Sequence, residues 1–248
     1  YAIDSGSKEL LLTSQDNGAF GADTGSSLEN LLMELSHLDG EFRLRVGMLN
    51  PMLVAGRSHE MAKAWGDSRT YKFMHLPIQS GSQKILDSMV RDHTVGEFWE
   101  VVNVFRDYYP EMMIITDIIT GFPGETDEDH HKTISLLNEL SPDLVNVTRF
   151  SPRKGTPASR YKRINGRIVK KRSRELTILR KELGAKSFRR FVGRKTSILT
   201  VENQKRGSTL CRDDNYRPII LMEELPLGEF YDVEIIDSEY GFMTAILV

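Results

Sequence analysis

The sequence predicts an α/β fold: a partial, open parallel β/α barrel followed by a small all-β barrel. Two observations indicate the parallel β/α barrel. Five apolar, β-branched runs have the length of strands, and helical patterns lie between these runs. A third observation indicates the second part, since residues 186–248 contain only short strand-like runs separated by polar turns. Five strands are too few to close an eight-stranded barrel, so we expect an open one.

Strands and helices alternate over residues 1–165. We expect the strands at Glu9–Thr13, Phe42–Met48, Lys72–Ile78, Met113–Ile119 and Leu144–Phe150. We expect the helices at Leu28–Leu38, His59–Trp65, Gln83–Arg91, Gly96–Tyr108 and Thr126–Leu140. Thr126 is the predicted N-cap of the last helix, and three acidic residues follow it, where the helix dipole favours negative charge.

A basic helix over residues 166–185 is predicted to link the two parts. Leu176, Leu179 and Leu183 share one face of it, and Gly184 is expected to end it. The small barrel then occupies residues 186–248, with strands predicted in KTSILTVE, RPIILM, EFYDVEIID and GFMTAILV.

The composition limits the possible classes of function. The chain has 248 residues, of which 40% are hydrophobic and 27% charged, and no run reaches the roughly 18 apolar residues that span a membrane. The first residues lack the pattern of a signal peptide, so we expect a cytoplasmic protein without membrane partners. The single Cys211 excludes an internal disulfide and an iron–sulfur site built from several thiolates of this chain.

Positive charge is concentrated in one segment. Tyr161 to Lys195 contains fourteen Lys and Arg residues against two acidic residues, although the whole chain has a net charge of −2. After Lys195 there are ten acidic residues and only four basic ones, namely Lys205, Arg206, Arg212 and Arg217. A polyanionic partner is therefore expected to meet the linking helix and the first strand of the small barrel.

The carboxyl ends of parallel strands are where α/β proteins bind ligands. Here these ends read TSQDNGAFG, GMLNP, HLPIQSGS, TGFPGE and RFSPRKGTP, which are all polar or rich in Gly and Pro. We expect them to converge on one rim. In TGFPGE a buried strand passes through a Gly-containing loop into a helix N-terminus, an order that presents backbone amides to a ligand.

Three long motifs, HLPIQSGSQKILDSMVRDHT, TDIITGFPGETDED and FSPRKGTPAS, resemble the radical S-adenosylmethionine methylthiotransferase family. The segments SILTVE, DDNYRPIIL and LGEFYDVEI resemble its C-terminal TRAM module, a small β-barrel that binds RNA. LLLTSQDNGAFG and FRLRVGMLNP look most similar to the archaeal and eukaryotic branch. The substrate of that branch is N6-threonylcarbamoyladenosine beside the tRNA anticodon.

The resemblance implies that S-adenosylmethionine binds at the rim. Its adenine would pack against the loop Asp117–Glu125, where Gly121 would let the backbone approach the base and Ile119 and Phe122 would offer apolar contact. The widespread pattern Gly-x-Ile-x-Gly-x-x-Glu is met only in part, because Asp117 stands at the first Gly and Gly124 at the Glu.

The resemblance also implies contacts to the rest of the cofactor. Gln15 and Arg45 would meet the ammonium or carboxylate of the methionine end, and Gln79 and Ser80 would meet the ribose hydroxyls. Gln15 could instead cap its own loop, and Arg45 could belong to a surface ladder. We interpret His75 as a hydrogen-bonded core residue rather than a ligand.

Candidate RNA contacts fall into three groups. Arg153 and Lys154 follow the last strand of the open barrel and could meet a modified base that carries a carboxylate, although a solvated turn explains them nearly as well. Phosphates could meet the linking segment, and unstacked bases could meet a turn of the small barrel if its tyrosine is not packed inside. The residues of these two groups are Lys170, Lys171, Arg172, Arg174, Arg189 and Arg190, then Asn215, Tyr216 and Arg217.

The predicted helix Thr126–Leu140 begins with acidic residues and histidines, which are residue types that could bind a metal. We interpret it as a helix N-terminus that complements the helix dipole rather than as a metal site. The residues concerned are Asp127, Asp129, His130 and His131.

The family cleaves S-adenosylmethionine with a 4Fe–4S cluster on three cysteines and holds a second cluster on three cysteines of an N-terminal domain. None of these six cysteines is present in this sequence. The resemblance therefore implies that the chain is the C-terminal part of an enzyme and has no catalytic residue, metal ligand or activity of its own. The parent protein would also need an electron donor and a sulfur source.

Other functions remain open from the sequence. One is a non-catalytic RNA-binding protein with a degenerate barrel, and another is an unrelated enzyme that uses Asp117 and Glu125 for acid–base chemistry. Within the family, a ribosomal protein or isopentenyladenosine would be alternative substrates.

Overall fold

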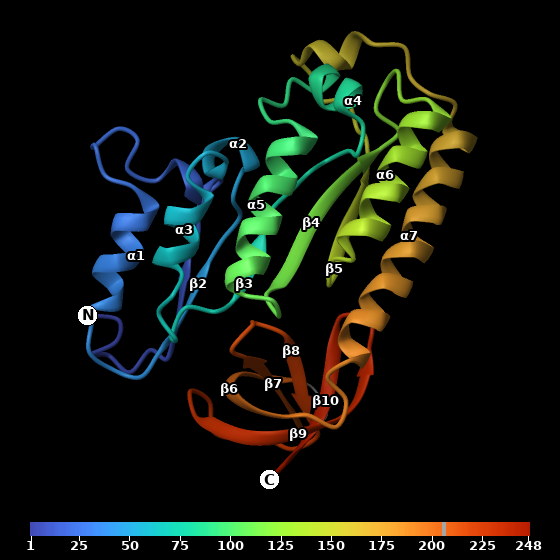
Figure 1. Ribbon diagram of the computed structural model, residues 1–248. Coiled ribbons are helices and arrows are strands. Elements are labelled where there is room, and N and C mark those ends of the chain that lie inside the picture. The colour runs from blue at the N-terminus through green and yellow to red at the C-terminus, as the bar shows by residue number, and fades with distance from the viewer. Residues whose placement is uncertain (205–206) are drawn as a thin grey trace.

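The computed structural model describes residues 1–204 and 207–248 and shows two parts that are joined by one long helix (Figure 1). The first part contains the parallel strands β1 (Glu9–Leu12), β2 (Arg43–Val46), β3 (Phe73–His75), β4 (Met113–Thr120) and β5 (Leu144–Arg149). β1 pairs with β2, while β3, β4 and β5 form a second sheet in that order. A bridge between Leu44 and Thr70 connects the two sheets. All five predicted strands are confirmed.

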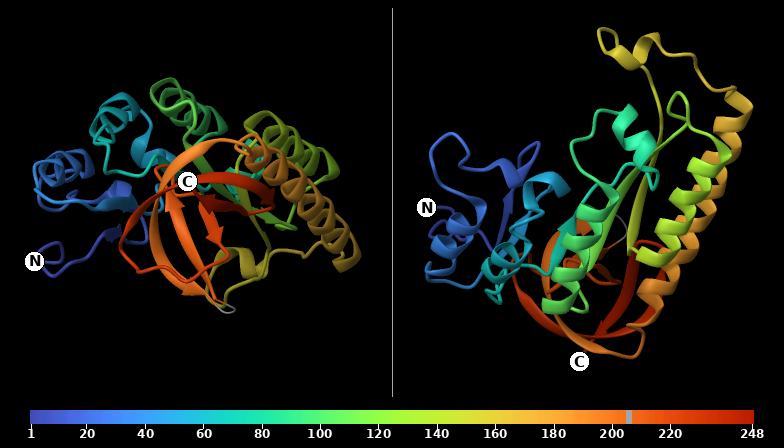
Figure 2. Two further views of the ribbon diagram at one scale, coloured as in Figure 1. Left: turned by 90° about the horizontal axis from the view of Figure 1, so that it is seen from below. Right: turned by 45° about the horizontal axis from the view of Figure 1, so that its top comes forward.

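Helices cover one face of these strands and form an arc outside them (Figure 2, left). Apolar side chains of β3 and β4, such as Met74, Ile114 and Ile118, pack there against Val101 of α5 and Leu137 of α6. The predicted helices are confirmed, and the short α2 was missed. Their bounds are α1 (Leu28–Ser36), α2 (Pro51–Val54), α3 (Ser58–Ala64), α4 (Gln83–Ser88), α5 (Val95–Tyr108) and α6 (Asp127–Leu140), with 3-10 turns at Asn17–Ala19 and Pro157–Arg160.

The other side of the strands, called the inner face below, carries the alternate residues. These are Arg43 and Arg45 of β2, Phe73 and His75 of β3, and Met113, Ile115, Asp117 and Ile119 of β4. Because β4 and β5 pair in parallel register, Asn146 and Thr148 lie beside Asp117 and Ile119 on the same face. Over β3, β4 and β5 the inner face is therefore apolar near the strand starts and carries the polar side chains of His75, Asp117 and Asn146 nearer the carboxyl ends.

The linking helix α7 runs from Gly166 to Arg189 and packs against β5 and α6. The prediction that Gly184 ends it is wrong, because the helix continues for five more residues. A Cβ atom at Gly184 would lie 2.6 Å from the ring of Tyr240 and 2.8 Å from the Asp143 carbonyl oxygen. Glycine is thus required here for close packing of the helix against the turn between β9 and β10 and against the residue before β5.

The C-terminal part is a closed barrel with the strand order β10-β8-β7-β6-β9. Buried side chains that include Ile198, Cys211, Ile219, Val233 and Met243 fill it. β7 was not predicted, since its sequence STLCRD lacks a long apolar run. The strands are β6 (Lys195–Gln204), β7 (Ser208–Asp213), β8 (Pro218–Leu221), β9 (Phe230–Glu239) and β10 (Phe242–Leu247).

The C-terminal barrel lies against the starting ends of the parallel strands, opposite the rim (Figure 1). Tyr71, Phe73 and Met113 of the first part share one buried cluster with Phe188 and Phe191 of the α7 end and with the barrel interior. The two parts are therefore joined by a common core as well as by α7. Within the part of the chain that the structure describes, no helix is long and apolar enough to cross a membrane.

Candidate functional site

A hollow of about 360 Å³ opens at the carboxyl ends of β4 and β5, below the segment that follows β5. Apolar and hydroxyl side chains line it from the strands and from that segment. Its lining also includes three arginines and, among the described residues, no acidic side chain. The hollow can therefore hold a flat apolar group and attract a negatively charged one. The lining residues are Met89, Arg91, Ile119, Phe122, Thr148, Arg149, Phe150, Ser151, Arg153, Thr156 and Ala158.

A polar triad lies on the inner face across β3, β4 and β5. One carboxylate oxygen of Asp117, Oδ1, lies 3.1 Å from Nε2 of His75 and accepts a hydrogen bond of 2.8 Å from Nδ2 of Asn146. Partial burial opposes the charge of Asp117, but the hydrogen bonds from both neighbours outweigh it, so the pKa of this carboxyl is lowered. The triad therefore presents an ionised carboxylate on the inner face, and the interpretation of His75 as a hydrogen-bonded residue is confirmed.

Gln79 lies in the segment after β3 and joins it to β4 by backbone hydrogen bonds. Its N–H donates to the Asp117 carbonyl at 2.8 Å, and its own carbonyl accepts from the Ile119 N–H at 2.9 Å. Its φ of 71° lies in the left-handed region, which is uncommon for a residue with a side chain and costs free energy. The ribose contact expected of Gln79 stays a prediction.

The hydroxyl of Ser80 is not available to a ribose. Its Oγ lies 3.4 Å from the hydroxyl of Thr133 in α6 and accepts a hydrogen bond from the Ser82 N–H, and the residue is buried. The expected contact between Ser80 and the cofactor is wrong, because this side chain holds the start of α4 against α6. The sequence around Ser80 does not indicate that α6 covers this side chain.

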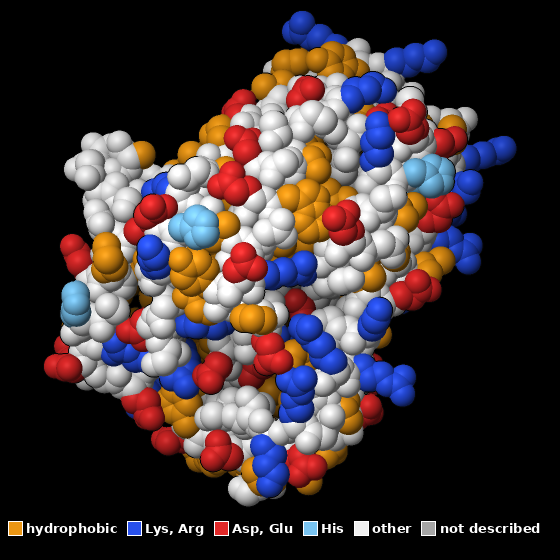
Figure 3. All heavy atoms as spheres, in the orientation of Figure 1, with side chains coloured by type: hydrophobic (Ala, Val, Ile, Leu, Met, Phe, Trp, Pro, Cys, Tyr) orange, Lys and Arg blue, Asp and Glu red, His pale blue; other side chains and the backbone are white. Residues whose placement is uncertain are grey.

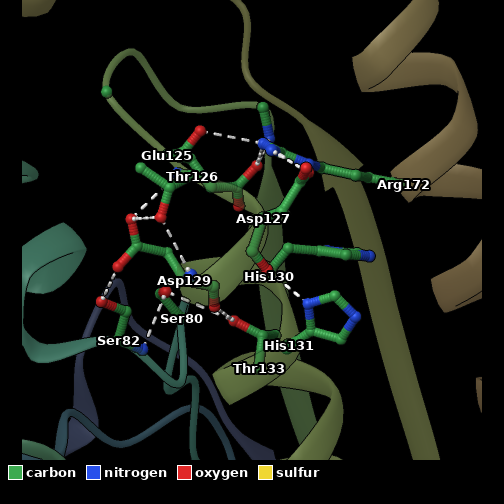
Figure 4. Close-up of polar contacts among 12 residues, drawn as sticks. Ser80, Ser82, Glu125, Thr126, Asp127, Asp129, His130, His131, Thr133 and Arg172 are labelled. Atoms are coloured by element: carbon green, nitrogen blue, oxygen red, sulfur yellow. Dashed lines mark hydrogen bonds and ion pairs between the residues drawn. The ribbon is translucent and has the colours of Figure 1, made fainter.

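The turn after β4 is held by a buried carboxylate (Figure 4). Oε2 of Glu125 accepts a hydrogen bond of 2.9 Å from the Gly121 N–H and lies 2.7 Å from Nη1 of Arg172 in α7. A Cβ atom at Gly121 would lie 2.6 Å from the side chain of Val169, also in α7. The glycine therefore makes room for α7, whereas from the sequence we expected it to make room for adenine. Glu125 is equally unavailable as an acid–base partner of Asp117.

The start of α6 is a fully capped helix N-terminus. Thr126 and Asp129 form a reciprocal capping box, and Asp129 also accepts a hydrogen bond of 2.7 Å from the Ser82 hydroxyl and pairs with Lys84 at 3.1 Å. His130 bonds Glu175 of α7 at 2.9 Å. No group of His, Cys, Asp and Glu that could hold a metal ion is found in residues 1–204 and 207–248. The interpretation of this segment as a helix N-terminus is confirmed.

Arg45 points from β2 toward the C-terminal barrel. Its guanidinium lies 4.8 Å from the ring centroid of Phe73 and 4.9 Å from that of Tyr216, so aromatic rings cover it. Gln15 is exposed in the loop after β1. The contacts of both residues with the methionine end of a cofactor stay predictions.

The turn Asn215–Arg217 packs inside the molecule and does not offer a stacking platform to RNA. Tyr216 meets Tyr71 and Phe73 edge to face, each at 5.0 Å, and Asn215 bonds the Asp213 carboxylate through its backbone. The guanidinium of Arg217 is 1% exposed and pairs with Asp213 at 3.1 Å. The predicted RNA contacts of Tyr216 and Arg217 are wrong, because the barrel uses these side chains to dock on the first part, while the contact of Asn215 stays a prediction.

Most basic side chains of α7 lie on its outer surface, and the exceptions are the buried Arg172 and the half-buried Arg180, which donates to the Val145 carbonyl. Lys170, Lys171 and Arg174 are exposed, as are Arg189 and Arg190 at the end of the helix. Arg172 is buried and paired, so the prediction that it contacts phosphate is wrong. Figure 3 shows Lys and Arg side chains along the upper and right-hand edges, over α7 and the segment after β5. Lys205 and Arg206 lie outside the described residues.

The remaining candidates lie close to the hollow. Ile119 is half-buried and lines it, while Phe122 is 4% exposed and packs edge to face against Phe150 at 4.9 Å. Arg153 and Lys154 are exposed on the segment after β5, and Arg153 lines the hollow. Their contacts with a ligand stay predictions, but the structure brings Ile119, Phe122 and Arg153 together around one space.

Comparison with known proteins assigns the family. Residues 3–137, which include every strand and helix from β1 to most of α6, match the Radical SAM superfamily. The chain belongs to this superfamily. Coproporphyrinogen III oxidase from Escherichia coli, a radical SAM enzyme, has a similar fold, with a TM-score of 0.53 over 75% of this chain and 42% of that chain at 16% identity.

Relatives of higher identity extend through the C-terminal barrel. A probable threonylcarbamoyladenosine tRNA methylthiotransferase from Archaeoglobus fulgidus is 44% identical over 98% of this chain. The threonylcarbamoyladenosine tRNA methylthiotransferase of Homo sapiens is 33% identical over 95% of it. The chain spans 57% of the length of the first relative and 41% of the second.

The radical SAM family uses S-adenosylmethionine and a 4Fe–4S cluster, and the two groups fit this chain differently. The hollow and the polar inner face offer apolar, hydroxyl and charged groups that suit a nucleoside with an amino acid tail. The cluster has no ligand set here, because Cys211 is the one cysteine and lies inside the C-terminal barrel. Burial raises the pKa of Cys211 to about 12, which disfavours the thiolate that binds iron.

Two features of the site were missed from the sequence. The triad of His75, Asp117 and Asn146 depends on the register of three strands, and the alternation of apolar and polar residues in IITDIIT and LVNVTR was the available signal. The pair of Glu125 and Arg172 joins residues 47 positions apart, and no local pattern marks it.

Proposed function

We propose that the protein containing this chain adds a methylthio group to C2 of N6-threonylcarbamoyladenosine next to the tRNA anticodon. The observation that carries the proposal is the similarity to archaeal and eukaryotic proteins of that description over 95–98% of this chain. The chain contributes the S-adenosylmethionine site and the tRNA surface. When bound, S-adenosylmethionine and a reduced cluster supply the radical chemistry.

The cofactor would occupy the inner face and the adjoining hollow. Ile119 and Phe150 would pack against the adenine, and the ionised carboxylate of Asp117 would accept hydrogen bonds from ribose hydroxyls. Gln79 and Gln15 would extend this site toward the methionine end. The cluster ligands and a second 4Fe–4S cluster would belong to residues outside this chain, which therefore has no methylthiotransferase activity alone.

Transfer RNA would lie along the exposed side of α7 and over the segment that carries Arg153 and Lys154. The basic side chains there attract phosphate, whereas residues 196–248 contain ten acidic residues and four basic ones. The barrel, which resembles a TRAM module, would support the RNA surface by holding α7 in place. The domains of this proposal are residues 1–165, 166–185 and 186–248, with α7 extending into the last range.

The substrate would be recognised by charge. The threonylcarbamoyl group carries a carboxylate, and Arg91, Arg149 and Arg153 all line the hollow at the rim. Isopentenyladenosine has an uncharged apolar group that gains nothing from three guanidinium groups. A loop of a ribosomal protein would not use the long basic surface of α7. An electron donor and a sulfur source would serve the whole enzyme, and we place that enzyme in the cytoplasm.

Binding of anticodon stem-loops by the whole protein tests the substrate assignment. We expect a stem-loop with threonylcarbamoyladenosine next to the anticodon to bind several-fold more tightly than stem-loops with adenosine or isopentenyladenosine there. The Arg153→Gln variant should lose this preference, whereas a Lys63→Gln variant on the distant helix α3 should keep it. Equal affinities for all three stem-loops would contradict the assignment.

A further inference from the structure

The polar contacts of Arg172 join α7, the helix proposed to bind tRNA, to the turn after β4 beside the proposed cofactor site. We infer that Arg172 is a positioning residue that holds the turn Gly121–Glu125 in its cofactor-binding shape and couples tRNA binding on α7 to cofactor binding. This inference rests on the proposed function for the identity of the two ligands. Its structural basis is the contact of Arg172 with Glu125 (Figure 4).

Arg172 binds the turn through three separate acceptors. Its Nη1 donates to the Glu125 carboxylate at 2.7 Å and to the Glu125 carbonyl at 3.0 Å, and its Nη2 donates to the Asp127 carboxylate at 2.8 Å. The side chains of Arg172 and Glu125 are only 5% and 3% exposed. Water cannot easily replace the two bonds to Glu125, so the guanidinium fixes both the side chain and the backbone of this residue.

Glu125 passes this constraint on to the turn. The carboxylate oxygen that pairs with Arg172 also accepts the Gly121 N–H at 2.9 Å. Gly121 has a φ of 78°, and its neighbour Phe122 and the preceding Ile119 both line the hollow. A carboxylate without its guanidinium would be buried and unpaired, and the turn would change conformation to expose it.

Three basic neighbours of Arg172 on α7 face outward. Lys170, Lys171 and Arg174 are exposed on the surface proposed to meet phosphates, while Val169 fills the space beside Gly121. A ligand that shifts or orders this turn of the helix therefore acts directly on the cofactor turn. Coupling of this kind is reciprocal, so each ligand should raise the affinity for the other by the same factor.

The test uses the whole protein with its clusters and measures S-adenosylmethionine affinity by calorimetry, with and without saturating tRNA. For the natural protein we expect tRNA to raise the affinity about fivefold or more. Arg172→Met should weaken cofactor binding about tenfold or more and abolish the effect of tRNA. Arg172→Lys, which keeps the charge but loses the fork of donors, should restore part of both.

Glu175→Gln is the matched control, because Glu175 also joins α7 to α6, through His130, but does not touch the turn. This variant should keep both the cofactor affinity and the effect of tRNA. Hydrogen exchange of residues 117–126 provides a second readout, which should accelerate in Arg172→Met and stay unchanged in Glu175→Gln. If Arg172→Met does not fold, Glu125→Gln replaces it and should weaken cofactor binding in the same direction.

Two results would overturn the inference: unchanged cofactor affinity in both the Arg172→Met and Glu125→Gln variants, or an equal loss in Glu175→Gln. A tRNA that binds the natural protein without changing its cofactor affinity would also overturn it. Failure of tRNA to bind at all would instead contradict the proposed function.

Discussion

The guanidinium of Arg45 in β2 lies 4.9 Å from the ring centroid of Tyr216 in the C-terminal barrel. A strand of the radical SAM sheet and a turn of the barrel therefore meet inside the molecule. Tyr71 and Phe73 complete the contact with edge-to-face packing on the same ring. The barrel is fixed beneath the strands, so α7 and its basic surface are held at a defined distance from the rim.

Arg217 should be essential for this docking. The buried Arg217 guanidinium donates to the Glu111 carbonyl of the first part and pairs at 3.1 Å with Asp213 of the barrel, whose pKa is raised by burial. We expect Arg217→Met to lower the free energy of unfolding by about 3–5 kcal/mol, because a buried charge loses its partner. Urea unfolding measures the loss. Arg194→Met, which removes a half-exposed pair with Glu111, should cost about 1 kcal/mol or less. Similar losses in both variants would refute the account of docking.

The exposed basic residues of α7 should dominate tRNA affinity. We expect the triple change of Lys170, Lys171 and Arg174 to Ala to weaken tRNA binding. It should also reduce the slope of log affinity against log salt by about 2–3, because a phosphate that is no longer contacted keeps its counterions. Filter binding at several salt concentrations measures both effects. The control change of Lys8 and Lys63 to Ala, on the opposite side of the first part, should alter neither. An unchanged slope in the triple variant would show that α7 only links the two parts.

Asp129 should give the protein an acid-dependent stability. Burial alone would raise its pKa, but hydrogen bonds from Ser82 and Thr126 and the charge of Lys84 hold that pKa well below the usual range. A lowered pKa means that the stabilisation is complete above about pH 4, the usual value in the unfolded chain, and is lost as the pH falls further. Asp129→Asn should therefore cost about 1–3 kcal/mol at pH 7 and progressively less from pH 4 to pH 2.

The same unfolding series on Glu128→Gln provides the control for Asp129. Glu128 is exposed, and its pair with Lys132 lies on the helix surface. Its replacement should leave the free energy of unfolding at pH 7 nearly unchanged, because solvent screens an exposed pair of this kind. A difference between the natural protein and Asp129→Asn that does not shrink in acid would contradict the assigned role of the carboxylate.

Gly184 should resist replacement although it lies within a helix. A Cβ atom there would lie 2.6 Å from Tyr240, so we expect Gly184→Ala to destabilise the protein by about 1–3 kcal/mol despite the higher helix propensity of alanine. Gly166→Ala is the matched control, because no atom lies within 4 Å of its added Cβ. It should be neutral or slightly stabilising in thermal unfolding. A neutral Gly184→Ala variant would show that β9 can move away from α7.

Most strands, most helices and the rim could be predicted from the sequence because their signals are local. The alternation in Met113–Thr120 and the cap at Thr126 depend on residues a few positions apart. The errors concern side chains whose environment comes from distant segments. Ser80 is covered by α6, and Arg172 is covered by the turn after β4.

The same reason explains the errors in the C-terminal barrel. Tyr216 and Arg217 have the composition of an RNA contact, and their burial depends on Phe73 and Phe191, which are far away in the sequence. A glycine such as Gly184 is typical of a helix end, but here the close approach of Tyr240 explains why the residue is glycine. Composition identified the residue types that such sites use, whereas packing decided which of them face solvent.

Mass spectrometry of tRNA nucleosides tests the central claim most directly. The measurement compares a strain that lacks the gene for the whole protein with the same strain after the gene is restored. The account predicts that the methylthio form of N6-threonylcarbamoyladenosine disappears from the mutant, that its threonylcarbamoyl precursor accumulates, and that restoration reverses both changes. An unchanged nucleoside profile in the mutant would contradict the claim.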